Sequence, residues 1–188
     1  MLEKVLAFDT QLFVYLNGLG SETYDGLWLF ITKQSNWTPF FLILLYLVYK
    51  KLGTKPTLIL LLFVALLLLV SDQTCNLFKY SFQRLRPCNN PEIKSVIRIV
   101  KSSDTFSFFS GHAANSMATM TFLFFLLKKY YRYAFLLFLF PLIFAYSRIY
   151  LGLHYPLDIV TGYLFGAIFG FVAYQLYQKY VLKHSRNG

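Results

Sequence analysis

Three residues that lie close together in the sequence combine a cation, an imidazole and a carboxylate: Arg148, His154 and Asp158, in the stretch S-R-I-Y-L-G-L-H-Y-P-L-D. Asp158 follows His154 by four positions, so the two side chains can touch across one helical turn. A carboxylate on one ring nitrogen fixes the tautomer of an imidazole and makes the other nitrogen more basic. His154 is therefore a candidate nucleophile. The planar, permanently charged guanidinium of Arg148 suits phosphate.

A second stretch, K-Y-S-F-Q-R-L-R-P, supplies two more cations, Lys79 and Arg86. A phosphoryl group under transfer spreads negative charge over its equatorial oxygens, so a site without a metal needs several fixed cations. A single basic residue at a membrane edge is usually an anchor whose charge reaches the interface. The order of Lys79, Arg86 and Arg148 along the chain, together with two histidines, favours a phosphate site instead.

A third stretch, F-S-G-H, opens an apolar run with Ser110, Gly111 and His112. The first amides of a helix have no partners within the helix and attract anions. Gly111 allows close approach of a ligand to the backbone, and Ser110 can cap the helix or contact phosphate. His112 taken alone would be a structural polar residue. Near neutral pH a histidine is also suited to acid and base catalysis.

In order and spacing, the three stretches resemble the signature of the type 2 phosphatidic acid phosphatase (PAP2) superfamily, which contains integral-membrane lipid phosphatases and soluble vanadium haloperoxidases. The resemblance implies that His154 is a nucleophile that forms a phosphohistidine, that Asp158 orients it, and that His112 is the general acid and later the base. It implies no metal and no other cofactor. The family motif usually has proline where this chain has Phe109, which puts the stiffness of that loop in doubt. The residues implied to bind the phosphate are Lys79, Arg86, Ser110, Gly111 and Arg148.

The composition is that of a membrane protein. Of 188 residues, 57% are hydrophobic and only 14% are charged, which is far from the balance of a soluble domain and predicts a single membrane domain. The net charge of +10 does not predict nucleic-acid binding, because the cations fall mostly in gaps between apolar runs. Cys75 and Cys88 fit no metal-binding spacing, and no disulfide is expected. Asp9 interrupts the first apolar stretch, so no cleavable signal is expected.

The apolar runs predict an all-α integral membrane fold, a helical bundle of five or six transmembrane helices. Several runs are short against the roughly 20 residues that cross a bilayer, but flanking aromatic and basic residues can extend them. Residues 1–33 are amphipathic and are expected to lie along the interface, with a sixth span as the alternative, and residues 34–188 then form the catalytic bundle. The expected spans are Asn36–Tyr49, Pro56–Lys79, Ser110–Leu127, Tyr133–Ser147 and Pro156–Tyr180.

Basic residues in the gaps predict the orientation. By the positive-inside rule, the side that carries three basic sets is cytoplasmic, and the three motif stretches then lie on the outer side. The three sets are Lys50, Lys51 and Lys55, then Lys128, Lys129 and Arg132, then Lys179, Lys183 and Arg186.

Two further features of the spans call for an interpretation. Asp72 lies about 25 Å along a helix from Lys55, near the outer edge of the bilayer core. It is either a partner for a motif cation or an interfacial acid. Gly162, Gly166 and Gly170 recur every four positions, which favours close packing of the last helix within the molecule over dimerisation.

The sequence therefore predicts a lipid phosphatase at the outer face of a bacterial cytoplasmic membrane, with a lipid phosphate that reaches the site from the bilayer. The candidate substrates that the resemblance implies are phosphatidylglycerol phosphate, phosphatidic acid, undecaprenyl diphosphate and lipid A phosphates. One alternative is a phosphotransferase that passes the phosphoryl group to a lipid or sugar acceptor. The other is a transport or binding protein that holds lipid phosphates without catalysis.

Overall fold

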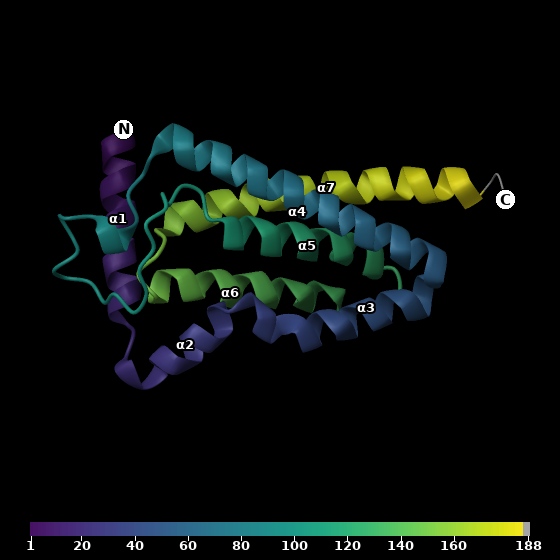
Figure 1. Ribbon diagram of the computed structural model, residues 1–188, viewed down its shortest axis with the longest axis horizontal. Helices are drawn as coiled ribbons and strands as arrows, with labels where there is room; N and C mark the ends of the chain where they lie inside the picture. The colour runs from purple at the N-terminus through teal and green to yellow at the C-terminus, as the bar shows by residue number, and fades with distance from the viewer. Residues whose placement is uncertain (186–188) are drawn as a thin grey trace.

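The computed structural model describes residues 1–185, and every regular element within them is a helix, with loops between some of the helices (Figure 1). Short 3₁₀ turns connect some of the helices: η1 (Glu22–Tyr24), η2 (Gln34–Trp37), η3 (Pro87–Asn89) and η4 (Ala134–Phe138). The helices are α1 (Leu2–Gly18), α2 (Asp25–Thr32), α3 (Thr38–Leu52), α4 (Thr54–Phe82), α5 (Gly111–Leu127), α6 (Leu139–Tyr150) and α7 (Pro156–Ser185).

A helix lies at each of the five predicted spans. By length and composition, α4 and α7 can cross a membrane, and residues Ala134–Tyr150 form a shorter apolar helical segment. The other two, α3 and α5, contain 15 and 17 residues. The all-α class is confirmed, and the number of spans stays a prediction. Pro156 is the first residue of α7, the place at which its missing N–H costs least.

The glycines of α7 pack inside the molecule, as predicted. A Cβ atom built on Gly162 would lie 2.7 Å from the backbone oxygen of Ser110, and one built on Gly166 would meet that of Ala114. Helix α7 therefore lies directly against α5, with no room for a side chain between the two backbones. This close packing brings the beginnings of α5 and α7, which carry two of the three motifs, to the same end of the bundle.

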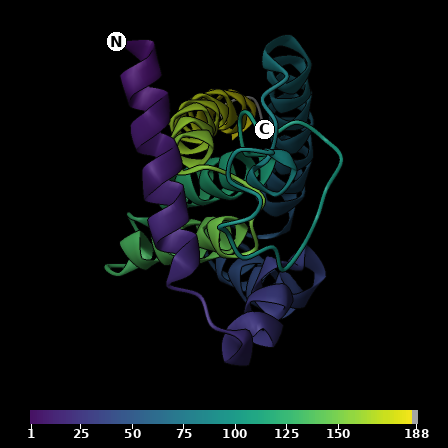
Figure 2. The same ribbon diagram turned by 90° about the vertical axis from the view of Figure 1, so that its left-hand side faces the viewer.

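The two helices of the N-terminal segment lie differently. Helix α1 crosses the end of the bundle at a steep angle (Figures 1 and 2). The buried side chain of Asn17 holds α1 against the end of α6: its Nδ2 donates to the backbone oxygens of Ile149 and Tyr150, both at 3.1 Å. Helix α2 instead packs along α6, where the Trp28 ring stacks on Tyr150 at 5.1 Å. How both helices sit relative to the bilayer stays a prediction.

The predicted basic sets and the motif stretches lie at opposite ends of the bundle. The α3–α4 junction, the end of α5 and the end of α7 lie at one end, and the three motif stretches lie at the other, beside α1 (Figure 1). The three predicted basic sets thus share one end, apart from Arg186, which lies outside the described residues. The arrangement is the one that the predicted topology requires.

Candidate active site

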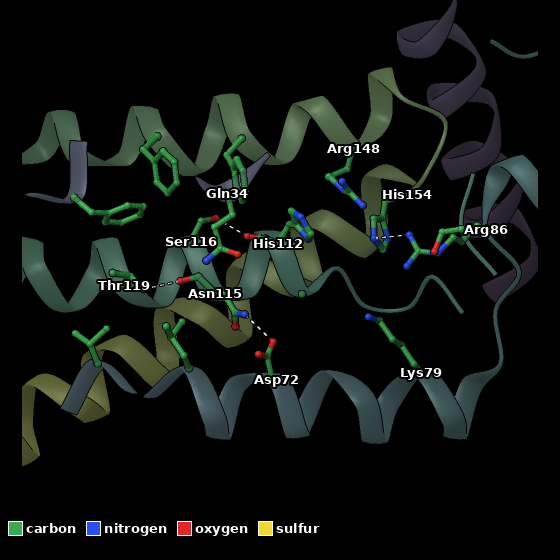
Figure 3. Close-up of a pocket in the computed structure, with 17 residues that line it drawn as sticks. Gln34, Asp72, Lys79, Arg86, His112, Asn115, Ser116, Thr119, Arg148 and His154 are labelled. Atoms are coloured by element: carbon green, nitrogen blue, oxygen red, sulfur yellow. Dashed lines mark hydrogen bonds between the residues drawn. The ribbon is translucent and has the colours of Figure 1, made fainter. Parts of the chain in front are cut away.

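A cavity of about 560 Å³ opens between α4, α5 and α6 at the motif end of the bundle (Figure 3). The predicted site residues converge on it from all three motifs. Those that line it are Lys79, Arg86, Gly111, His112, Arg148 and His154. Ser110 and Asp158 do not line the cavity; both are fully buried behind it.

His154 lies in the loop between α6 and α7 and is held from both sides. Its Nδ1 lies 3.3 Å from Oδ2 of Asp158, and its Nε2 lies 3.0 Å from Nη1 of Arg86. A guanidinium can only donate hydrogen bonds, so Nε2 accepts and Nδ1 carries the proton that Asp158 accepts. The arrangement selects the tautomer whose lone pair is on Nε2, the nitrogen beside the cations.

The charge state of His154 follows from its surroundings. The side chain is 2% exposed. Burial lowers the pKa of His154 well below its usual range, and the nearby charges of Arg86 and Arg148 lower it further. The imidazole is therefore neutral at physiological pH, which is the form that a nucleophile needs.

Backbone and hydroxyl groups position two of the cations. Arg86 donates through Nε to the backbone oxygen of Thr105 at 2.7 Å, and through Nη2 to the Thr105 hydroxyl at 2.8 Å. Arg148 donates through Nη1 to the hydroxyl of Thr32 at 2.7 Å. Lys79 reaches the cavity from α4, on the side opposite His154 (Figure 3). Three cations from two distant parts of the chain therefore surround one space.

The start of α5 forms another wall of the cavity. The Ser110 hydroxyl accepts a hydrogen bond from the backbone N–H of Ala113 at 3.4 Å. Its observed role is thus to cap the helix, and Gly111 is the residue that faces the cavity. The ring of Phe109 is fully buried and stacks on Phe165 at 4.9 Å. Aromatic packing therefore fixes this loop where the family motif has proline.

His112 and His154 face the same cavity from different elements (Figure 3). The His112 ring stacks on Phe144 with a centroid distance of 5.1 Å. The stacking fixes the plane of the ring, so that His112 can present a nitrogen to a group bound between the two histidines.

Sequence reasoning missed the residues that hold Asp158. Arg84 donates to Oδ1 of Asp158 at 2.7 Å and to Oδ2 of Asp9 at 2.6 Å. Asp9 also accepts from the backbone N–H of Leu157 at 2.7 Å, and the Arg84 guanidinium lies 3.9 Å from the ring centroid of Tyr155. The available signals were an acid within the apolar stretch of α1 and an extra arginine within the Lys79–Arg86 motif.

Asp72 lines the cavity but is not paired with a motif cation. Its observed partner is Asn115 of α5, whose Nδ2 donates to Oδ1 of Asp72 at 2.7 Å. Of the two interpretations of Asp72, the ion pair with a motif cation is therefore not formed among the described residues. Cys75 and Cys88 are both free and buried.

Comparison with known proteins identifies the family. The PAP2 superfamily model matches residues 56–182, and the chain therefore belongs to the PAP2 superfamily. It is 35% identical to a lipid A 4′-phosphatase of Bacteroides thetaiotaomicron over 184 residues, which cover 95% of this chain and 81% of the relative. It is also 30% identical to an undecaprenyl-diphosphatase of Sulfolobus acidocaldarius over 182 residues, covering 93% and 81%.

Two solved structures share the fold. A PAP2-type phosphatidylglycerolphosphate phosphatase from Bacillus subtilis has a TM-score of 0.72 at 18% identity, covering 94% of this chain and 87% of that one. Aquifex aeolicus LpxE has a TM-score of 0.67 at 24% identity, covering 88% and 94%. With the family and the apolar helices, these findings define an integral membrane enzyme that hydrolyses phosphoric esters.

Proposed function

We propose that this enzyme hydrolyses a lipid phosphomonoester or diphosphate through a phosphohistidine on His154, at the outer face of the membrane. The observation that carries the proposal is the state of His154. Its pKa is lowered by burial, its tautomer is fixed by Asp158 and Arg86, and its lone pair is on Nε2, on the side of the cations. Lys79, Arg86 and Arg148 line the same cavity and supply the charge that a transferring phosphoryl group requires.

The reaction proceeds in two balanced steps. Nε2 of His154 attacks phosphorus, the bond from phosphorus to the leaving oxygen breaks, and His112 gives that oxygen a proton. A water molecule then attacks the phosphohistidine while the neutral His112 takes one of its protons. The bond between phosphorus and Nε2 breaks, inorganic phosphate leaves, and both histidines return to their starting states.

The cavity continues into a surface suited to lipid chains. A groove of about 390 Å³, lined mainly by leucine, valine and phenylalanine of α3, α4 and α5, adjoins it. A substrate can place its phosphate among the cations and its apolar chains in the groove. This supports a lipid that enters from the bilayer and not a water-soluble phosphate ester. The residues common to the cavity and the groove are Gln34, Phe41, Val64 and Thr119.

The first experiment is a panel of purified lipid phosphates, with released inorganic phosphate as the readout. Release without an added acceptor is the expected result and separates hydrolysis from phosphotransfer. If phosphate appears only when a lipid or sugar acceptor is supplied, the enzyme is a phosphotransferase. Binding of the lipids with no turnover under any condition would contradict both.

The second experiment separates the two histidines by rapid-quench labelling with a radioactive phosphoryl donor. His154→Ala should form no covalent intermediate with any substrate. His112→Ala should still be phosphorylated by p-nitrophenyl phosphate, provided that the site admits it, because p-nitrophenolate leaves without needing a proton. The label should be acid-labile and base-stable, as a phosphohistidine is. Label that persists in His154→Ala would mean that the nucleophile is another residue.

A further inference from the structure

The cavity is polar well beyond the part that a phosphate needs. Asp72 and Asn115 line it together, joined by their hydrogen bond, and Figure 3 shows the pair away from His154 and Arg86. Neither residue belongs to the three motifs, and neither has a role in the two steps of hydrolysis. Their place in the cavity therefore requires a separate explanation.

Helix geometry gives the depth of this pair. Asp72 and Lys79 are seven positions apart on α4 and share a face, so Asp72 lies about 10 Å farther along the cavity than the cation. On α5, Asn115 follows His112 by one turn, and Thr119 follows Asn115 by another. Leu68 and Val64 lie one and two turns beyond Asp72 on α4, and the other lining residues include Phe41, Phe140 and the polar Gln34. The cavity thus runs from cations, through a polar middle, to a mainly apolar end.

The chemistry of the polar middle specifies its ligand. An ionised carboxylate only accepts hydrogen bonds and offers about four lone-pair positions. The Asn115 amide occupies one of them and holds the carboxylate in place. Asp72 is otherwise exposed, so a bound molecule can reach the remaining positions. A group that fills them must donate hydrogen bonds, as a hydroxyl or an amide N–H does.

We infer that Asp72 and Asn115 form a headgroup subsite that binds hydroxyl or amide N–H groups placed between the phosphate and the lipid chains. The inference rests on the proposed function and specifies its substrate class. The preferred substrate is a phosphomonoester of a sugar lipid, such as an acylated amino sugar, whose headgroup carries such donors within reach of the phosphate.

Polyprenyl phosphates fit this subsite poorly for two reasons. In a polyprenyl monophosphate the hydrocarbon begins directly after the phosphate, and burying a carboxylate against hydrocarbon without a hydrogen-bond partner is unfavourable. In a polyprenyl diphosphate, the second phosphate would extend toward Asp72, where two negative charges repel each other. The subsite therefore selects against both.

The test compares two phosphomonoesters in the same mixed micelles: a phosphorylated glucosamine lipid with amide-linked acyl chains, and undecaprenyl phosphate. The readout is the ratio of the two kcat/KM values for phosphate release. The wild-type ratio should favour the glucosamine lipid, and Asp72→Leu and Asn115→Leu should each lower it about tenfold or more, as for the loss of a hydrogen bond to a charged group. The matched control is Gln73→Leu, an exposed neighbour on α4 outside the cavity, which should leave the ratio unchanged.

The possible results distinguish a failure of the subsite inference from a failure of the proposed function. If the wild type hydrolyses both lipids with equal kcat/KM, or if folded Asp72 and Asn115 variants keep the wild-type ratio, the subsite inference is wrong and the proposed function stands. If the wild type releases phosphate from neither lipid nor from any other lipid of the panel, the proposed function itself is wrong. Asp72→Asn, which removes the charge but keeps the shape, replaces Asp72→Leu if the latter does not fold. It should lower the ratio in the same direction.

Discussion

Replacing Arg84 by glutamine should damage the enzyme although Arg84 does not line the catalytic cavity. Arg84 neutralises two carboxylates at once, Asp9 at 2.6 Å and Asp158 at 2.7 Å, and these side chains are 5% and 0% exposed. Removing one partner of a buried ion pair costs about 3–5 kcal/mol. The Arg84 side chain is itself 19% exposed, so we expect a value near the lower end, about 3 kcal/mol.

The catalytic effect should be separate from the loss of stability. Without Arg84, Oδ1 of Asp158 loses its charged partner, and the backbone N–H of Tyr155 still holds Oδ2 at 3.0 Å. The contact of Asp158 with Nδ1 of His154 should therefore loosen, and loss of such a supporting contact typically lowers activity about 10–100-fold. The loss should be in kcat, measured with saturating lipid in detergent micelles, while inhibition by vanadate stays near the wild-type value, because the cations of the cavity are intact. Thermal unfolding of the same preparation measures the change in stability.

Two variants make the reasoning refutable. Arg98→Gln breaks the ion pair with Asp25, at 2.8 Å and partly exposed. It should leave kcat unchanged because, unlike Arg84, the Arg98 side chain does not pair with Asp158. Asp9→Asn combined with Arg84→Gln should be less destabilised than the sum of the two single variants, since only one carboxylate then lacks its partner. Wild-type kcat in a folded Arg84→Gln variant would refute the positioning role. So would an equal loss of kcat in Arg98→Gln.

Four further predictions concern the proposed chemistry and topology. Activity should persist in excess EDTA, since the cations of the cavity supply the charge stabilisation; complete loss with rescue by magnesium would contradict this. Vanadate should inhibit competitively, and Arg148→Ala should weaken that inhibition together with turnover; unchanged vanadate binding would make Arg148 a mere anchor. Because burial lowers the pKa of His154, nitrogen NMR of the free enzyme should show a neutral ring protonated on Nδ1 down through pH 6.5, where a solvent-exposed histidine is half charged; a midpoint at or above 6.5 would contradict the assigned environment. Cysteines introduced at Asn90 and Lys129 should be labelled from outside and inside, respectively, and the reverse pattern would overturn the topology.

The sequence predicted the parts of the site that short patterns encode. The four-residue spacing of His154 and Asp158 predicted that they can touch, and the structure shows the contact, with His154 in the loop directly before α7 and Asp158 in its first turn. The glycines at every fourth position of α7 predicted the face that packs against the rest of the molecule, and Pro156 predicted where the helix begins. In each case the relevant neighbours lie within a few residues or recur with the helical period, so that no knowledge of the tertiary fold is needed.

The partners of these residues could not be predicted in this way. The contacts of Arg86 with Thr105, of Arg148 with Thr32, and of Asp72 with Asn115 join residues that are 19, 116 and 43 positions apart. No local periodicity links such positions, because each contact depends on how whole helices pack. Ser110 shows the related limit: its type suits either a cap or a phosphate ligand, and only the fold shows that its hydroxyl turns to Ala113.

The N-terminal segment illustrates how tertiary packing changes the meaning of a sequence feature. The amphipathic pattern of residues 1–33 predicts helices that lie along the interface, apart from the catalytic bundle of residues 34–188. In the structure, Asp9 of α1 pairs with Arg84, and Thr32 of α2 accepts from Arg148. Asp9 also accepts from the backbone N–H of Leu157, in the first turn of α7. The acid that interrupts the apolar stretch of α1 therefore helps to fix the helix that carries Asp158, and the segment belongs to the physical unit that orients His154, the proposed nucleophile.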